Sequence, residues 1–92
     1  MIRMAGVVSA VVGAAVLSAP SAAADQDEYL SKLQDRYAFL TAQQLLAEGD
    51  RVCAAERAGA LSPDKTAMVA NDLQVSVAMA LEIVSAAEWD LC

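Results

Sequence analysis

The chain has 92 residues, which is too few for two ordinary domains, and its hydrophobic share of 58% includes a strongly apolar N-terminal segment. It carries twelve acidic and six basic side chains, for a formal net charge of −6 at pH 7. Such a balance repels phosphate backbones and anionic lipid surfaces, so nucleic acids and membrane surfaces are disfavoured as partners.

Residues 1–24 are predicted to be a secretory signal peptide. Met1 to Met4 supplies a short basic start, Ala5 to Leu17 an apolar run, and Ala22-Ala23-Ala24 a small-residue cleavage site. The apolar run falls short of the roughly 20 residues that a membrane-spanning helix needs. We therefore expect cleavage after Ala24 or one residue earlier. The mature protein is then secreted to the extracellular space or cell envelope, with no stable membrane insertion.

Residues 25–92 are predicted to form one small domain, because they contain no internal repeat, low-complexity tract or linker. Removal of the leader, whose sole charged residue is Arg3, leaves twelve acidic and five basic residues and a net charge of −7. A first amphipathic helix is expected where apolar residues stand three or four apart. These residues are Leu30, Leu33, Tyr37 and Leu40.

A second amphipathic helix is predicted from about Ala42 to Ala58. Thr41 and Gln44 stand three apart, as in a capping box, and Gly59 tolerates the left-handed conformation that ends many helices. The same helical spacing relates the residues of its expected inner face. These are Leu45, Gly49, Val52 and Cys53.

A third helix is predicted to start at Ser62-Pro63-Asp64. The Ser62 side chain can accept a hydrogen bond from the first free amides, Pro63 has no amide hydrogen to leave unpaired, and Asp64 complements the helix dipole. A bend near Asn71 to Val75 is expected to separate this helix from the last segment.

The last segment is ambiguous, because apolar residues from Val75 to Leu81 alternate with Ser and Ala as in a half-buried strand. Helix is favoured, since the alanines favour it and a lone strand would find no partner for its backbone. Ser76 is the expected cap. A continuous helical stripe consists of Val77, Ala80, Leu81, Val84, Ala87 and Leu91. The predicted fold class is therefore all-α, a small bundle of three or four short helices.

The fourth helix carries two apolar stripes that cannot both face one core. We expect the first to pack inward, and it consists of Val77, Leu81, Val84 and Leu91. The second is then partly exposed, and it consists of Met79, Ile83, Ala86 and Trp89. Exposed apolar ridges of this kind bind partner helices, so Trp89, Ile83 and Met79 are the candidate partner contacts, with Trp89 as the anchor.

A domain of this size has a marginal core, so a covalent staple is expected. Cys53 and Cys92 are the only cysteines, and export places them where pairing is the default. One intramolecular disulfide is predicted, with an intermolecular bridge as the alternative. A redox-active pair fits poorly, since such cysteines usually lie close together in the sequence.

The mature chain contains several short motifs in a fixed order. They are an aromatic-Leu-x-x-Leu at Tyr29 to Leu33, the run Gly49 to Cys53, Gly59 soon after, and Ala87 five residues before Cys92. Their order and the cysteine placement resemble a family of small secreted mycobacterial proteins built on one domain of unknown function, DUF seven-three-two. The resemblance covers essentially the whole mature chain. It implies a small helical fold, two paired cysteines and no known activity, and therefore assigns no catalytic residue.

The absence of histidine removes the usual general base, zinc ligand and haem ligand together. No catalytic residue, metal site or cofactor is predicted, and the protein is not expected to be an enzyme. The expected function is an exported protein interaction module, either a monomer or a weak homodimer, with an unknown protein partner. The alternative is a small extracellular carrier of an apolar ligand. A continuous internal cavity would favour the carrier, and an exposed apolar patch would favour the partner.

Overall fold

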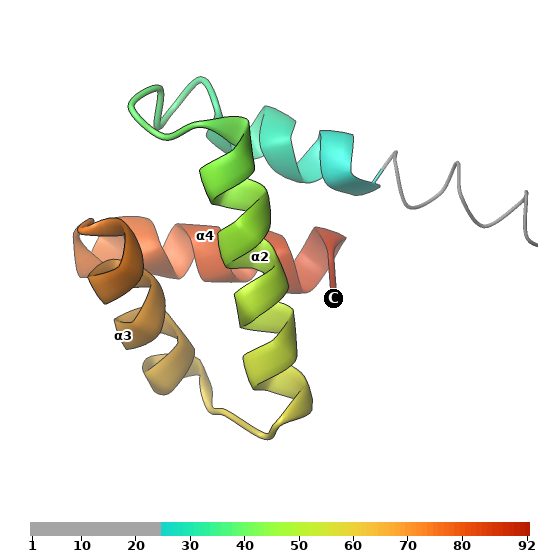
Figure 1. Ribbon diagram of the computed structural model, residues 1–92, viewed down its shortest axis with the longest axis vertical. Coiled ribbons are helices and arrows are strands. Elements are labelled where there is room, and N and C mark those ends of the chain that lie inside the picture. Colours follow the sequence, from blue (N-terminus) through green and yellow to red (C-terminus); the bar gives the residue numbers. More distant parts are fainter. Residues whose placement is uncertain (1–24) are drawn as a thin grey trace, which may run out of the picture.

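The computed structural model describes residues 25–92, and the predicted signal peptide, residues 1–24, lies outside the described residues. The described part is helical and has no strand. A helix over residues 25–33 is followed by α2 (Ala42–Arg57), α3 (Ser62–Leu73) and α4 (Val77–Asp90). The predicted all-α bundle is therefore confirmed (Figure 1).

Helix α2 begins and ends as its sequence predicts. The Thr41 hydroxyl accepts from the Gln44 amide at 3.0 Å, and the Gln44 side chain accepts from the Thr41 amide at 2.9 Å, which completes the capping box. At the other end Gly59 has a φ of +92°, in the left-handed region. The last helical residue, Arg57, lies one position before the predicted end.

Helix α3 starts at Ser62, but the predicted role of this residue is wrong. The cap position is Leu61, which makes no side-chain hydrogen bond, and Ser62 already belongs to the first turn. Its carbonyl oxygen accepts from the Thr66 hydroxyl at 2.9 Å. The helix ends at Leu73 and is capped by Gln74, whose φ of 56° is left-handed.

The chain then bends by 113° between α3 and α4, within the predicted interval from Asn71 to Val75. No single helix of residues 25–92 is long and apolar enough to cross a membrane. The two helices reach that length and composition only together, across this bend.

The last segment is the predicted helix and not a strand. The Ser76 hydroxyl accepts from the Met79 amide at 3.2 Å, so the expected cap is present. The predicted inner face is wrong in part, because Val77 is 67% exposed and Leu81 is 49% exposed. The face that packs inward instead consists of Ala80, Ile83, Val84 and Ala87, all fully buried. The last three stand three, four and seven positions after Ala80, which is the spacing of one side of a helix.

The first predicted helix is shorter than its apolar periodicity. Residues 34–39 form turns, in which the amides of Gln34 and Tyr37 donate to carbonyl oxygens four positions back at 2.8 and 2.9 Å. Isolated turns of this kind place side chains that are three or four residues apart on the same side of the chain, although they do not form a regular helix. Tyr37 and Leu40 are therefore buried as the spacing predicts, although the helix has ended at residue 33.

In Figure 1, α2 crosses α4, and α3 lies beside them. Ion pairs join Lys32 to Asp90 at 2.8 Å and Arg36 to Glu82 at 2.6 Å. The earlier residue, Lys32, pairs near the end of α4, and the later residue, Arg36, pairs nearer its start. Residues 32–36 therefore run antiparallel to α4. One core joins all four segments, and its buried members are Tyr29, Leu33, Tyr37, Leu40, Leu45, Val52, Val69, Ala80, Ile83, Val84, Ala86 and Ala87.

Candidate functional site

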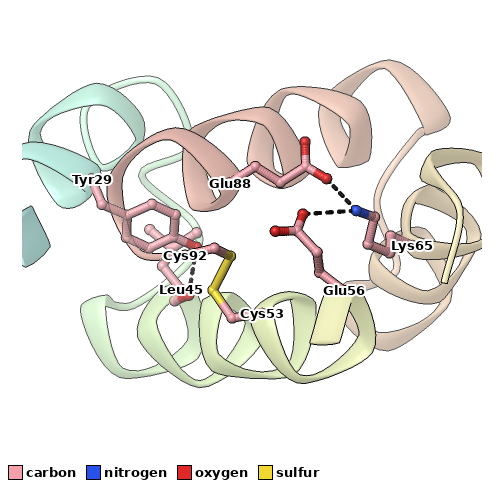
Figure 2. Close-up of a disulfide and its surroundings, with 7 residues drawn as sticks. All are labelled: Tyr29, Leu45, Cys53, Glu56, Lys65, Glu88 and Cys92. Atoms are coloured by element: carbon pink, nitrogen blue, oxygen red, sulfur yellow. Dashed lines mark hydrogen bonds and ion pairs between the residues drawn. A yellow bond between two sulfur atoms is a disulfide. The ribbon is translucent and has the colours of Figure 1, made fainter. Parts of the chain in front are cut away.

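The two cysteines form the predicted bridge within one chain. Cys53, in the C-terminal half of α2, is bonded to Cys92, just beyond α4, with their Cα atoms 5.3 Å apart (Figure 2). Neither cysteine is free. Both sulfur atoms are therefore committed to a link between α2 and the end of α4, and they offer no thiol for chemistry.

An ion cluster around the buried Lys65 side chain lies beside the disulfide, between α2 and α4 (Figure 2). The Lys65 ammonium of α3 donates to Glu56 of α2 at 3.0 Å and to Glu88 of α4. Hydrogen bonds to Glu88 and then Glu56 raise the pKa of Lys65, and the bond from Lys65 lowers the pKa of Glu56. An ammonium held charged in this way is neither a base nor a nucleophile. Its partners stand 9 and 23 residues away, so helical spacing gave no sign of them.

A second buried polar group, Glu48 of α2, was also not predicted. Its side chain is 4% exposed, and its buried Oε2 atom has no hydrogen-bond partner among the described residues. Burial is the main cause that raises the pKa of Glu48 to about 7, and the neighbouring Asp72 carboxyl group contributes to this rise. The positive charge of Arg51 acts in the opposite direction and lowers the pKa. The Tyr29 hydroxyl nearby donates to the Leu45 carbonyl at 2.6 Å (Figure 2). Burial, and then the charges of Glu48 and Asp50, raises the pKa of Tyr29.

Glu48 has the raised pKa of a general acid but not the setting of one. It lines none of three surface hollows that the described residues form. A catalytic acid must come within hydrogen-bond reach of a substrate proton. Glu48 therefore lies in the interior of the fold, apart from these three hollows.

The outer side of α4 exposes a row of side chains four positions apart. This outer ridge consists of Val77, Leu81, Ser85 and Trp89, all exposed. Trp89, at 83% exposed, is the most exposed of the large apolar side chains. A helix that is apolar on both its inner and its outer side is usually covered on both. Here the described residues cover only the inner side.

Of the three predicted contact residues, only Trp89 lies on this ridge. Ile83 is fully buried, so its assignment to a contact surface is wrong. Met79 is half-buried and packs against the core, between the two faces. Leu81, which was expected inside, takes the place of Ile83 on the exposed side. The apolar ring of side chains around α4 hid which stripe faces the core.

Two open grooves run along the ridge, between α4 and residues 32–37. One, of about 490 Å³, is lined by Lys32, Leu33, Arg36, Glu82, Ser85, Ala86 and Trp89. The other, of about 600 Å³, shares Arg36, Glu82 and Ser85 with the first. Small side chains therefore lie directly beside the large ones.

Each carboxylate of α4 has a cationic partner. Glu82 pairs with Arg36, Asp90 pairs with Lys32, and Glu88 pairs with Lys65. The Tyr37 hydroxyl also donates to Glu82. Although residues 25–92 carry a net charge of −7, Glu82 and Asp90 beside the ridge are each matched by one cation, and Glu88 shares Lys65 with Glu56. Protein contact surfaces are depleted of charged residues and enriched in aromatic residues at their centres, and the ridge itself consists of uncharged side chains.

Among residues 25–92, no group of three or more His, Cys, Asp or Glu side chains is placed to hold a metal ion. No family model, curated protein or solved structure matches this chain. The resemblance to the mycobacterial family of unknown function stays a prediction, based on the short motifs and the cysteine spacing.

Proposed function

We propose that this protein is an exported, non-catalytic interaction module that binds another protein chain through the outer ridge of α4. The observation that carries the proposal is the exposure of Trp89, Leu81 and Val77 on a helix whose carboxylates are all paired. Tryptophan is enriched among the residues that dominate binding energies, and charged residues are depleted at interface centres.

The scaffold beneath the ridge supports this role. The disulfide fixes the end of α4 against α2, and the Lys65 cluster ties the helix to α2 and α3. A helix held in this way loses little conformational freedom when a partner docks, which lowers the entropic cost of binding. The ridge is therefore presented on a rigid element.

The same surface favours a protein over a small apolar ligand. A carrier buries most of its ligand in a concave site, whereas the grooves beside Trp89 and Leu81 are open to solvent. A protein partner covers an open face of this kind with a surface of its own. The apolar carrier is thus the weaker of the two candidates.

A binding comparison with matched variants tests the proposal. Oxidised wild-type protein, a Leu81→Ser/Trp89→Ala variant and a Leu61→Ser control are immobilised and exposed to the medium in which the protein is secreted. Leu61 is a suitable control because it is 70% exposed and lies directly before α3, outside α4 and its ridge. We expect proteins that wild type and control retain to be lost from the ridge variant. Equal retention by all three, or ridge-dependent retention of a small apolar molecule alone, contradicts the proposal.

A further inference from the structure

We infer that the partner of the outer ridge is a second copy of this chain, which docks α4 against α4 around a two-fold axis near Ser85. The inference rests on the proposed function and names the occupant of the same surface. It is carried by the order of side chains on the ridge, by the charges around it and by its area.

The order of side chains on the ridge is symmetric about Ser85. Leu81 lies one turn before this small residue, and Trp89 lies one turn after it, both exposed. When two such helices cross in antiparallel directions at Ser85, Leu81 of each copy meets Trp89 of the other. A two-fold interface requires this reciprocity, in which the same patch is used twice.

The packing geometry of helices suits such a contact. Side chains four positions apart form a ridge that fits the corresponding groove of another helix, and this is the commonest packing class in globular proteins. Ser85 and Ala86 line the groove beside Trp89, so small side chains leave room for an incoming large one. The ridge therefore provides both the projections and the hollows that a second copy needs.

The charges explain why two acidic chains can meet here. Two molecules with net charge −7 repel each other over most approaches. On the α4 side, Arg36 neutralises Glu82 and Lys32 neutralises Asp90 within each copy. This face is therefore one on which a second copy meets carboxylates that are already paired, which reduces the repulsion between the two chains.

The area of the ridge predicts a weak dimer. A tryptophan buries about 150 to 250 Å² in a contact, so the exposed parts of Trp89, Leu81 and Val77 together supply on the order of 400 Å² per copy. Two copies then bury about 800 Å², below the roughly 1,200 Å² at which standard specific interfaces begin, as is typical of weak contacts. We expect dissociation in the range of tens to hundreds of micromolar.

Sedimentation equilibrium of the oxidised protein, from about 1 µM to 1 mM, tests the inference. Wild type is expected to pass from monomer to non-covalent dimer, and Ser85→Glu to remain monomeric because it opposes two like charges at the axis. Asn71→Glu is the matched control, since it adds the same charge at an exposed position of α3. Leu81→Ser/Trp89→Ala is expected to weaken association at least tenfold. Far-ultraviolet circular dichroism checks that each variant is folded.

Three outcomes overturn the inference: wild type that stays monomeric to 1 mM, Ser85→Glu that dimerises as well as Asn71→Glu, or a dimer that disappears on reduction of an intermolecular disulfide. A wild-type monomer whose ridge still retains a different protein leaves the proposed function standing and removes only the second copy. Absence of ridge-dependent binding in both experiments overturns both.

Discussion

Glu48 illustrates how one side chain can make the fold depend on pH. In the folded protein its pKa is raised to about 7, whereas an unfolded chain titrates its glutamates near 4.3. The folded state therefore binds this proton more tightly than the unfolded state does. The contribution of Glu48 to the free energy of unfolding is fully present below about pH 4.5, is lost as the pH rises to about 7, and stays lost above that.

We predict that Glu48→Gln removes this dependence. Glutamine keeps the shape of the protonated acid and cannot ionise. The free energy of unfolding of the variant, relative to that of wild type, should therefore rise by about 2 kcal/mol from pH 5 to pH 8. Urea unfolding at both pH values measures the gain. Glu28→Gln, at an exposed position, serves as the control and should gain nothing. If the free energies of unfolding of Glu48→Gln and wild type differ by the same amount at pH 5 and at pH 8, the raised pKa of Glu48 is contradicted.

Ile83 and Leu81 offer a paired test of which side of α4 faces the core. Ile83 is fully buried, so Ile83→Ala should cost about 2 to 4 kcal/mol through lost burial and a cavity. Leu81 is 49% exposed, so Leu81→Ala should cost about 1 kcal/mol or less. Denaturant unfolding of both variants measures the two costs, and a larger cost at Leu81 would show that the helix faces the other way.

At the scale of elements, the helix ends were more predictable than the helix faces. The capping box at Thr41 and the cap at Ser76 are local signals, because a side chain bonds an amide three residues away. The signal at Ser62 misled by one residue, since Pro63 and Asp64 suit a first turn whether the cap is Ser62 or the residue before it.

The contacts between elements could not be predicted in the same way. Helix α4 carries apolar residues on both its inner and its outer side, so its spacing alone did not separate Ile83 from Leu81. Tyr37 and Leu40 kept a helical spacing through turns that are not a helix. The burial of Glu48 and the partners of Lys65 depend on segments distant in the sequence, which no local pattern records.

Two residues at helix ends have left-handed backbone conformations, and substitutions at these two positions should have opposite effects on stability. Gly59, with φ of +92°, follows α2, and Gln74, with φ of 56°, follows α3. Since left-handed backbone costs non-glycine residues roughly 1 kcal/mol, Gly59→Ala should destabilise by about that amount, and Gln74→Gly should stabilise by up to about 1 kcal/mol. Thermal unfolding tests both, and the same sign for both would contradict the interpretation. An alanine side chain at residue 59 meets no atom within 4 Å, so only the backbone is tested.

At the scale of the whole molecule, the disulfide supplies a large part of the stability. It closes a segment of 39 residues, and the chain-entropy model assigns such a loop about 3 to 4 kcal/mol. The double variant Cys53→Ser/Cys92→Ser should therefore melt roughly 15 to 25 °C lower than the oxidised wild type. Scanning calorimetry measures this shift. Reduced wild type should match the variant, and an unchanged melting temperature would show that the core suffices.

The bond between Cys53 and Cys92 also determines the path of a mechanical load. Tension applied between residue 25 and Cys92 runs along α2 as far as Cys53 and then across the sulfur atoms, so the covalent path of the load bypasses α3 and α4. Full stretching of the oxidised protein should release only the chain from residue 25 to Cys53, roughly 100 Å. After reduction the same pull should release roughly 230 Å. Single-molecule force spectroscopy can compare the two lengths. The helix that bears the outer ridge is thus shielded from tension as long as the bridge is intact.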